Sequence, residues 1–326
     1  DQIAFIRFDE SKVKEFTLDY YKGEAYPEKY TFKYPKVGEE NSKLTLFNYS
    51  IKKNKLRALD IGPREDDYIP RIQWTLNNDE LCVTWMNRDQ NHLRLILVNT
   101  KTKNNRILLE ERNKYYIDIH DHLQFLNGDR FLWTSEQDGF NHLYLYDMNG
   151  KLLRQLTKGT DELTDVYGMD FEEKNILCQF ATNDGTQRKV SLIQLADASH
   201  RDILSGAGTH NVQASPGLKY LFVSSSEISK PVEYRLTDVN GNTVRMLETN
   251  DALRQRMQEY SLGDVQLTKI MNREGTMLNA LMIKPKDFSP IKKYPVFMFL
   301  YGGPGSQQVM TRWNSPSHSW WVPMLA

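Results

Sequence analysis

A repeat of hairpins occupies the first three quarters of the chain and constrains its fold more than any other feature. Five anchor residues lie 44 to 49 residues apart, namely Leu46, Leu95, Leu143, Val190 and Tyr234. The residue four positions after every anchor is polar, and the residue thirteen positions after it is apolar. Around Leu143 the sequence alternates, turns through Asp-Met-Asn-Gly and continues to Leu156, as in a β-hairpin.

A second hairpin precedes each later anchor by about 20 residues. After turn residues such as Asn127-Gly128-Asp129 comes a strongly apolar strand, at residues 81–85, 131–134, 176–180 and 220–223. Four strands per repeat of roughly 45 residues predict the blades of a β-propeller, because one such unit cannot bury its faces without neighbours.

The repeats amount to four full blades and the end of another. The incomplete blade comprises residues 3–8 and 46–59, separated by an insertion rich in Tyr and Lys at residues 20–38. A propeller closes on itself. A chain that starts within a blade therefore leads us to expect further blades upstream.

The period stops after Leu247. Residues 250–257 offer a helix N-cap, Asn250, and good helix formers, so we expect a short helix there. Residues 265–271, 277–284 and 296–301 read as strands, and the last is continuously apolar, as expected for a strand buried on both faces. We predict a partial propeller at residues 1–249 and, at 250–326, a linker helix followed by the start of a second domain.

Composition excludes several classes of function. Lys plus Arg and Asp plus Glu both number 42, so no basic excess supports nucleic-acid binding. The longest apolar runs fall well short of the roughly 20 residues of a transmembrane helix. Cys82 and Cys178 lie in no metal-binding pattern and are expected to be buried strand residues.

The apolar run at residues 296–301 leads into Gly302, Gly303, Pro304, Gly305 and Ser306. Neither a phosphate loop nor a G-x-G-x-x-G motif is present. A tight turn without further role is one interpretation. The other is the oxyanion loop of an α/β-hydrolase, which places a hydrogen-bond donor at the negative charge of a tetrahedral intermediate.

The run Tyr-Gly-Gly-Pro-Gly-Ser-Gln at residues 301–307, preceded by Lys-Lys-Tyr-Pro-Val, resembles the oxyanion loop of the dipeptidyl peptidase IV family of serine peptidases, in the prolyl oligopeptidase group. Further similarities follow in the family's order at residues 3–10, 34–38, 85–91, 135–144 and 155–159. The resemblance therefore extends over nearly the whole chain.

The resemblance implies an intact protein with an eight-bladed propeller capping an α/β-hydrolase domain. It implies removal of N-terminal dipeptides with Pro, or less readily Ala, in second position, through an acyl-enzyme and without a cofactor. Tyr301 would be the oxyanion tyrosine, with Gly302, Gly303, Pro304, Gly305 and Ser306 forming its loop. It also favours a homodimer and an exported protein.

Some motifs of the family do not occur in these 326 residues. Gly-x-Ser-x-Gly, the nucleophile elbow, does not occur in it. By resemblance the Ser, Asp and His of the triad would follow Ala326, and the glutamate pair that binds the substrate amine would precede Asp1. The pairs Glu39-Glu40 and Glu110-Glu111 occupy other places, and we interpret them as loop charges. We expect the 326 residues alone to be inactive.

Two other functions stay open. One is a non-enzymatic propeller that binds peptides or acts as a scaffold, with a remnant of a hydrolase. The other is a tripeptidyl or acylaminoacyl peptidase of the same group.

Two minor features bear on the site. Tyr116 falls where the family's propeller sends a loop toward the substrate, and a role in the substrate wall is a further expectation. His120-Asp121-His122 could suggest a metal, but no third ligand is evident nearby, so a structural or surface role is favoured.

Overall fold

The computed structural model describes residues 1–62, 67–260, 263–300, 306–313 and 321–325. These residues form two compact units. One comprises residues 1–131 with 146–151, and the other residues 132–145 with 152–326. This division passes through the sheet formed by residues 124–155, whereas the domain boundary expected at residues 249 and 250 remains a prediction.

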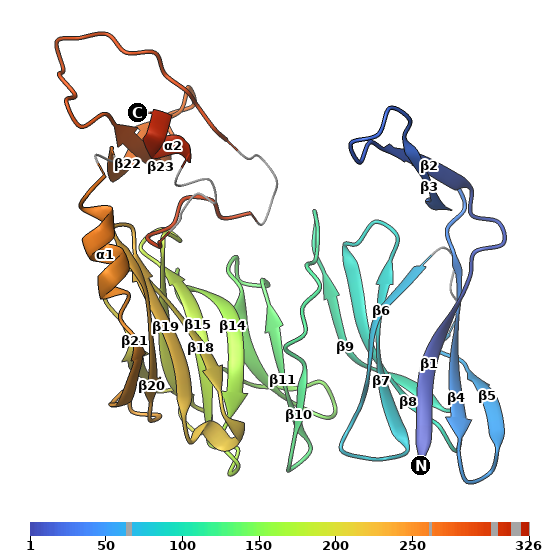
Figure 1. The fold of residues 1–326 in the computed structure, drawn as a ribbon. Coiled ribbons are helices and arrows are strands. Elements are labelled where there is room, and N and C mark those ends of the chain that lie inside the picture. The colour runs from blue at the N-terminus through green and yellow to red at the C-terminus, as the bar shows by residue number, and fades with distance from the viewer. Residues whose placement is uncertain (63–66, 261–262, 301–305, 314–320, 326) are drawn as a thin grey trace. The chain divides into compact units, whose positions relative to one another are not determined.

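The first unit contains an incomplete sheet, a hairpin arm and a complete four-stranded sheet (Figure 1). The incomplete sheet has the order β1 (Gln2–Asp9), β4 (Lys43–Ser50), β5 (Lys55–Leu59). The arm pairs β2 (Glu15–Tyr20) with β3 (Glu28–Lys33). The complete sheet runs β6 (Asp67–Trp74), β7 (Glu80–Asn87), β8 (His92–Asn99), β9 (Asn105–Arg112).

Three further groups of four consecutive strands follow. The first runs β10 (Gln124–Leu126), β11 (Arg130–Ser135), β12 (His142–Asp147), β13 (Leu152–Gln155). The second runs β14 (Glu162–Met169), β15 (Asn175–Thr182), β16 (Gln187–Gln194), β17 (His200–Leu204). The third runs β18 (Thr209–Ala214), β19 (Leu221–Glu227), β20 (Lys230–Thr237), β21 (Thr243–Glu248), with a 3-10 turn, η1 (Pro216–Leu218), between β18 and β19. The mainly β architecture of repeated four-stranded units is therefore confirmed.

The repeat in the sequence follows from strand pairing. Four anchors lie in the third strand of a four-stranded group, and Leu46 lies in β4, the middle strand of the incomplete sheet. All of them except Tyr234 are at most 1% exposed. Leu46 pairs with Leu59, the residue thirteen positions later. At Leu95, Val190 and Tyr234 the register shifts by one residue, so the partner is the fourteenth. These shifts are β-bulges, in which one strand carries an extra residue relative to its partner.

Each unit has its own apolar core. In the first, residues of β4, β5, β7 and β8 pack in one cluster that includes Leu46, Leu81 and Val98. In the second, Leu177, Val190 and Leu221 belong to one cluster within the eight-stranded sheet that β14–β17 and β18–β21 form together through the pairing of β16 with β18. Cys82 and Cys178 are 1% and 0% exposed, which confirms them as buried strand residues, and burial raises the pKa of the Cys82 thiol to about 12.

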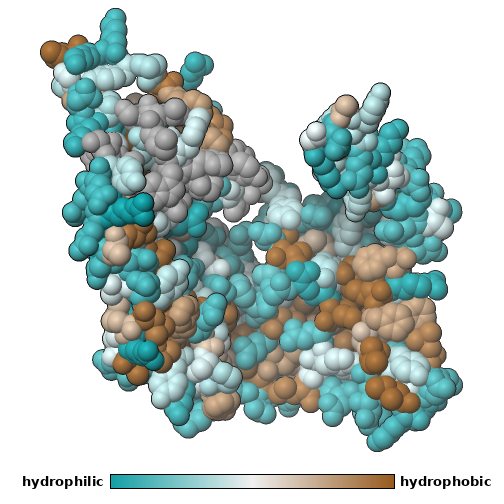
Figure 2. All heavy atoms as spheres, in the orientation of Figure 1, coloured by the Kyte–Doolittle hydropathy of each residue, from teal (hydrophilic) through white to brown (hydrophobic). Residues whose placement is uncertain are grey.

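Polar side chains cover much of the face shown in Figure 2, but hydrophobic groups gather over β1, β6 and β7. Alternate residues of β1 explain part of this surface. Ala4 and Ile6 pack against the core cluster, whereas Ile3, Phe5 and Phe8 are 51%, 38% and 58% exposed.

After the last blade come α1 (Asp251–Met257), the hairpin β22 (Asp264–Met271) with β23 (Met277–Lys284), and α2 (Trp321–Leu325). The predicted helix at 250–257 is confirmed. Asn250 occupies the N-cap position, but its amide donates to Val232 O instead of capping the helix. Within the described residues no helix is long and apolar enough to cross a membrane.

The predicted strand at residues 296–301 is wrong for its described part, because residues 296–300 form no strand. Among the described residues, β22 and β23 pair only with each other, so no third strand offers hydrogen bonds to this run. All five side chains are more than half exposed, and Phe297 contacts Trp321 edge to face with ring centroids 5.7 Å apart.

Candidate functional site

Most of the predicted oxyanion loop lies outside the described residues. Tyr301, Gly302, Gly303, Pro304 and Gly305 belong to this part of the chain. Ser306 is the first described residue after them; it is half-buried, and its Oγ accepts a hydrogen bond from Gln308 Nε2 at 2.8 Å. The geometry of this region therefore begins with the segment at residues 306–313.

Segment 306–313 binds to the ends of blade strands in the second unit. Thr311 N donates to Thr186 O at 2.7 Å, and Thr311 O accepts from Thr209 Oγ1 at 3.1 Å. Trp313 N donates to Ser226 Oγ at 3.2 Å, and Met310 is only 6% exposed. Backbone and side-chain bonds to two adjacent blades thus hold the chain just downstream of Tyr301.

One contact of this segment is the turn between β15 and β16, residues 183–186, which we call the docking turn. Its Asn-Asp-Gly sequence suits a left-handed backbone, and Asn183, Asp184 and Gly185 all have positive φ. A Cβ atom on Gly185 would lie 3.3 Å from Gln307 Oε1. Glycine therefore permits the close approach of segment 306–313.

The hairpin β22–β23 reaches the same turn. Lys269 forms an ion pair with the Asp184 carboxylate, and Asn279 Nδ2 donates to Asp184 O at 3.0 Å. These residues are 85 and 95 positions away in sequence, so no local pattern could have identified the contact.

Arg188, near the start of β16, donates hydrogen bonds to the backbone at the docking turn. Its Nη1 donates to Gly185 O at 2.7 Å and to Gln187 O at 2.9 Å. Burial lowers the pKa of this guanidinium, Glu162 opposes that shift, and Arg312 adds to it. The group stays charged at neutral pH because an arginine pKa starts far above it.

Tyr116 is 50% exposed and lies in the first unit, in the segment that follows β9. Two backbone bonds fix this segment to the turn between β7 and β8: Asn113 N donates to Asn91 O at 2.9 Å, and Ile117 N to Gln90 O at 2.8 Å. Ile117 is 8% exposed and anchors the segment, which leaves the Tyr116 ring accessible to a ligand.

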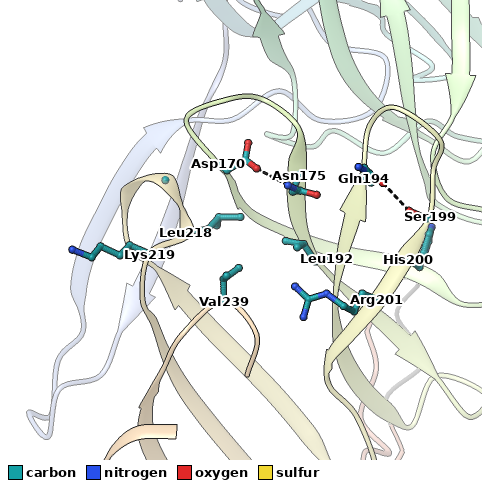
Figure 3. Close-up of a pocket in the computed structure, with 11 residues that line it drawn as sticks. Asp170, Asn175, Leu192, Gln194, Ser199, His200, Arg201, Leu218, Lys219 and Val239 are labelled. Carbon is teal, nitrogen blue, oxygen red and sulfur yellow. Dashed lines mark hydrogen bonds between the residues drawn. The ribbon is translucent and has the colours of Figure 1, made fainter. Parts of the chain in front are cut away.

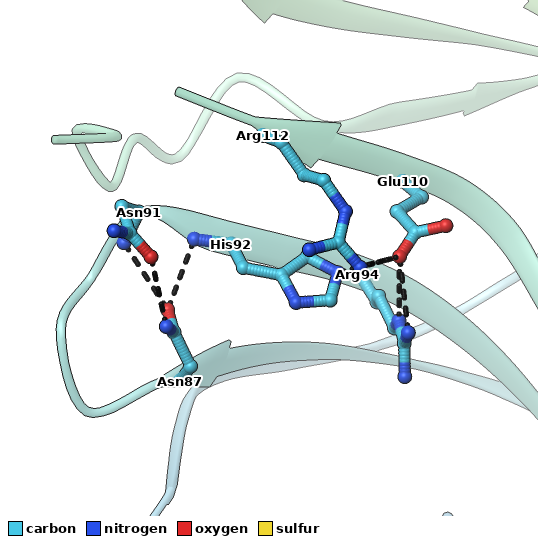
Figure 4. A network of polar contacts seen from close by, with 6 residues as sticks. All are labelled: Asn87, Asn91, His92, Arg94, Glu110 and Arg112. Atoms are coloured by element: carbon cyan, nitrogen blue, oxygen red, sulfur yellow. Dashed lines mark hydrogen bonds and ion pairs between the residues drawn. The ribbon is translucent and has the colours of Figure 1, made fainter. Parts of the chain in front are cut away.

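A polar network stabilises the strands beneath that turn (Figure 4). Asn87 Oδ1 accepts from the backbone N–H groups of Asn91 and His92 at 3.1 and 2.9 Å. Glu110 Oε1 lies 2.5 Å from His92 Nε2 and accepts from Arg94 Nε at 3.0 Å and Arg112 Nη2 at 3.1 Å. The hydrogen bond from His92, followed by that from Arg94, lowers the pKa of Glu110.

The interpretation of Glu110-Glu111 as loop charges is wrong, because both residues lie within β9. Their polar neighbours on β8 and β9 explain why a strand accommodates them. Glu39 and Glu40 do lie in a loop, where Glu39 accepts from Lys14 Nζ at 2.7 Å.

In the His120-Asp121-His122 triplet, the Asp121 carboxylate forms an ion pair with Arg71. Both oxygens of Asp121 accept hydrogen bonds from the Arg71 guanidinium, which lowers the pKa of Asp121. The rings of His120 and His122 stack with centroids 5.5 Å apart. In the part of the chain that the structure describes, no group of three potential ligands could hold a metal ion.

A cavity of about 620 Å³ lies among the turns of β14–β17 and β18–β21 (Figure 3). Leu192, Leu218 and Val239 supply its apolar side, and Asp170 accepts from Asn175 Nδ2 at 2.7 Å at its edge. The turns that line it join first to second and third to fourth strands, whereas the docking turn joins second to third. The cavity therefore lies at the other end of the blade from the docking turn.

Similarity to known proteins extends over nearly the whole chain. Residues 1–232 match the family model described as the dipeptidyl peptidase IV (DPP IV) N-terminal region. Dipeptidyl peptidase 4 of Trichophyton rubrum is 27% identical over 331 residues, which cover 97% of this chain and 43% of that protein.

Two solved structures share the fold. The crystal structure of Porphyromonas gingivalis dipeptidyl peptidase 4 superposes with a TM-score of 0.91 at 34% identity, over 99% of this chain and 46% of that one. A putative dipeptidyl aminopeptidase IV from Bacteroides ovatus gives a TM-score of 0.86 at 25% identity, over 100% and 49%. The chain thus spans less than half the length of these relatives, and the predicted propeller-type fold is confirmed.

Proposed function

The chain belongs to the dipeptidyl peptidase IV family, and from this membership we propose that it is part of a serine exopeptidase that releases N-terminal dipeptides. The family's members act on peptides, so a peptide is the substrate. The finer proposal is cleavage after Pro, or less readily Ala, in second position, through an acyl-enzyme. The observation behind it is the run Tyr-Gly-Gly-Pro-Gly-Ser at residues 301–306, next to a segment that the blades hold in place.

In this proposal Tyr301 donates its phenolic hydrogen to the oxygen that becomes negatively charged when the serine attacks. Gly302, Gly303, Pro304, Gly305 and Ser306 form the loop that presents this donor. A donor of this kind lowers the barrier by about 3–4 kcal/mol, because it is in place before charge develops. Tyr116 contributes an exposed aromatic wall for the substrate side chains.

The proposed architecture is a partial propeller at residues 1–249 followed by the first part of an α/β-hydrolase domain. Two exposed apolar surfaces support it. Ile3, Phe5 and Phe8 on β1 suit coverage by a preceding blade, and residues 296–300 suit a central position in a larger hydrolase sheet.

A homodimer is also part of the proposal. Aromatic rings are in mutual contact on and next to the β2–β3 arm: exposed Tyr20 and Tyr30 have centroids 6.2 Å apart, and exposed Tyr34 lies 5.7 Å from half-buried Phe32. Aromatic side chains are enriched where proteins associate. Sedimentation of the whole protein at twice the mass of one chain would support a dimer, and a monomer would contradict it.

Product analysis tests the proposed function most simply. The whole protein is incubated with a ten-residue peptide carrying Pro in second position, and the products are identified by mass spectrometry. We expect the Xaa-Pro dipeptide and the remaining octapeptide. A released tripeptide would favour a tripeptidyl peptidase of the same group, and an intact substrate would favour a peptide-binding scaffold.

A further inference from the structure

The docking turn combines a left-handed backbone with contacts to distant parts of the chain. Asn183, Asp184 and Gly185 have φ values of 51°, 55° and 81° in succession. Asn and Asp adopt this region more readily than other residues with a side chain, and glycine adopts it freely, so the sequence of the turn suits its shape. The turn also contacts other parts of the chain.

Three consecutive carbonyl groups of the docking turn accept hydrogen bonds. Asp184 O accepts from Asn279 Nδ2 at 3.0 Å, Gly185 O from Arg188 Nη1 at 2.7 Å, and Thr186 O from Thr311 N at 2.7 Å. The Asp184 side chain adds the ion pair with Lys269. A turn of four residues thus contributes both its backbone and its carboxylate to parts of the chain beyond residue 249.

The partners of the turn lie on both sides of the predicted oxyanion loop in sequence. Lys269 and Asn279 belong to β22 and β23, which precede it, and Thr311 follows it. Thr209 of β18 strengthens the downstream contact through its buried hydroxyl, which donates to Thr311 O at 3.1 Å. The propeller therefore binds the chain upstream and downstream of Tyr301 at one place.

We propose that the docking turn, with Thr209, is a positioning element for the peptidase reaction: it fixes the segments that flank the oxyanion loop. This proposal rests on the proposed function. An oxyanion donor works only within about 2.7–3.1 Å of the developing charge, and a displacement of about 1 Å costs roughly a hundredfold in rate. The docking turn itself touches no reacting atom and acts through segment 306–313.

Thr209→Val tests the downstream bond in the whole protein. Valine has nearly the shape of threonine but cannot donate to Thr311 O, whereas the matched variant Thr209→Ser keeps the hydroxyl. We expect kcat to fall about tenfold in Thr209→Val with KM within about twofold, because substrate binding groups stay in place. Thr209→Ser should keep the parent kcat.

Gly185→Ala tests the turn itself. Its Cβ would meet Gln307 Oε1 at 3.3 Å, at a φ of +81°. Gly139→Ala is the matched control, since Gly139 has φ +101° in the corresponding turn of the preceding blade and has nothing within 4 Å of an added Cβ. Both variants carry similar backbone strain, so only Gly185→Ala should lower kcat.

Hydrogen exchange of residues 306–313 provides an independent readout. Faster exchange in Thr209→Val and Gly185→Ala, together with the loss in kcat, is the expected result. Faster exchange with an unchanged kcat would overturn the positioning role, as would an equal loss in Gly139→Ala. A parent protein that releases no dipeptide would overturn the proposed function and this role with it, while the exchange data would still report the docking contact.

Discussion

One carboxylate oxygen of Glu110 is contacted by three basic side chains that come from two strands. His92 and Arg94 come from β8, and Arg112 from β9 itself. The sequence shows only an acidic pair, Glu110-Glu111, because strand pairing alone brings the basic groups to it. Asp121 with Arg71, 50 residues apart, is a second such case. At this scale sequence reasoning identifies residue types but not their partners.

Glu110→Gln should make the protein less stable at neutral pH by an amount below about 1 kcal/mol, because the carboxylate is 37% exposed and solvent screens it. The folded pKa of Glu110 is lowered, so its contribution is present above the unfolded value of about 4.3 and is lost as pH falls through the folded pKa. Thermal unfolding of parent and variant should therefore converge on acidification. Glu24→Gln, at an exposed position, should match the parent at every pH; a constant difference for Glu110→Gln would contradict this.

The hairpins are the elements that the sequence predicts best. Three of their anchors pair with an apolar residue thirteen or fourteen positions later: Leu46 with Leu59, Leu95 with Leu109 and Val190 with Leu204. This local relation is visible in the sequence. The run at residues 296–300 shows the converse. Its apolarity predicts a strand, but a strand needs a neighbour, and the described residues provide none. The docking turn escaped prediction for the same reason, since its partners are distant in sequence.

Leu95→Ala should destabilise the first unit by about 2–5 kcal/mol, because the side chain is 0% exposed and its removal leaves a cavity in a packed sheet. Denaturant unfolding measures the loss. Leu152→Ala is the control in another strand: its side chain is 45% exposed, and we expect a much smaller change. Equal costs for both variants would contradict the assignment of the anchors to the core.

At the scale of the molecule, the chain combines two kinds of sheet. Repeated meanders form the propeller part, and the β22–β23 hairpin with segment 306–313 attaches to one of their turns. The zero formal charge agrees with a substrate bound by local groups rather than by a general field. Family membership follows from the sequence and the fold, whereas the chemistry proposed above rests on the role assigned to Tyr301.

Replacement of Tyr301 by phenylalanine in the whole protein tests this central claim most directly, with Gly-Pro-p-nitroanilide as substrate. Loss of the oxyanion donor should lower kcat by about 10²–10³-fold. Tyr260→Phe, at a position 57% exposed, is the matched control and should keep the parent rate. A Tyr301→Phe variant that also keeps the parent rate would contradict the account.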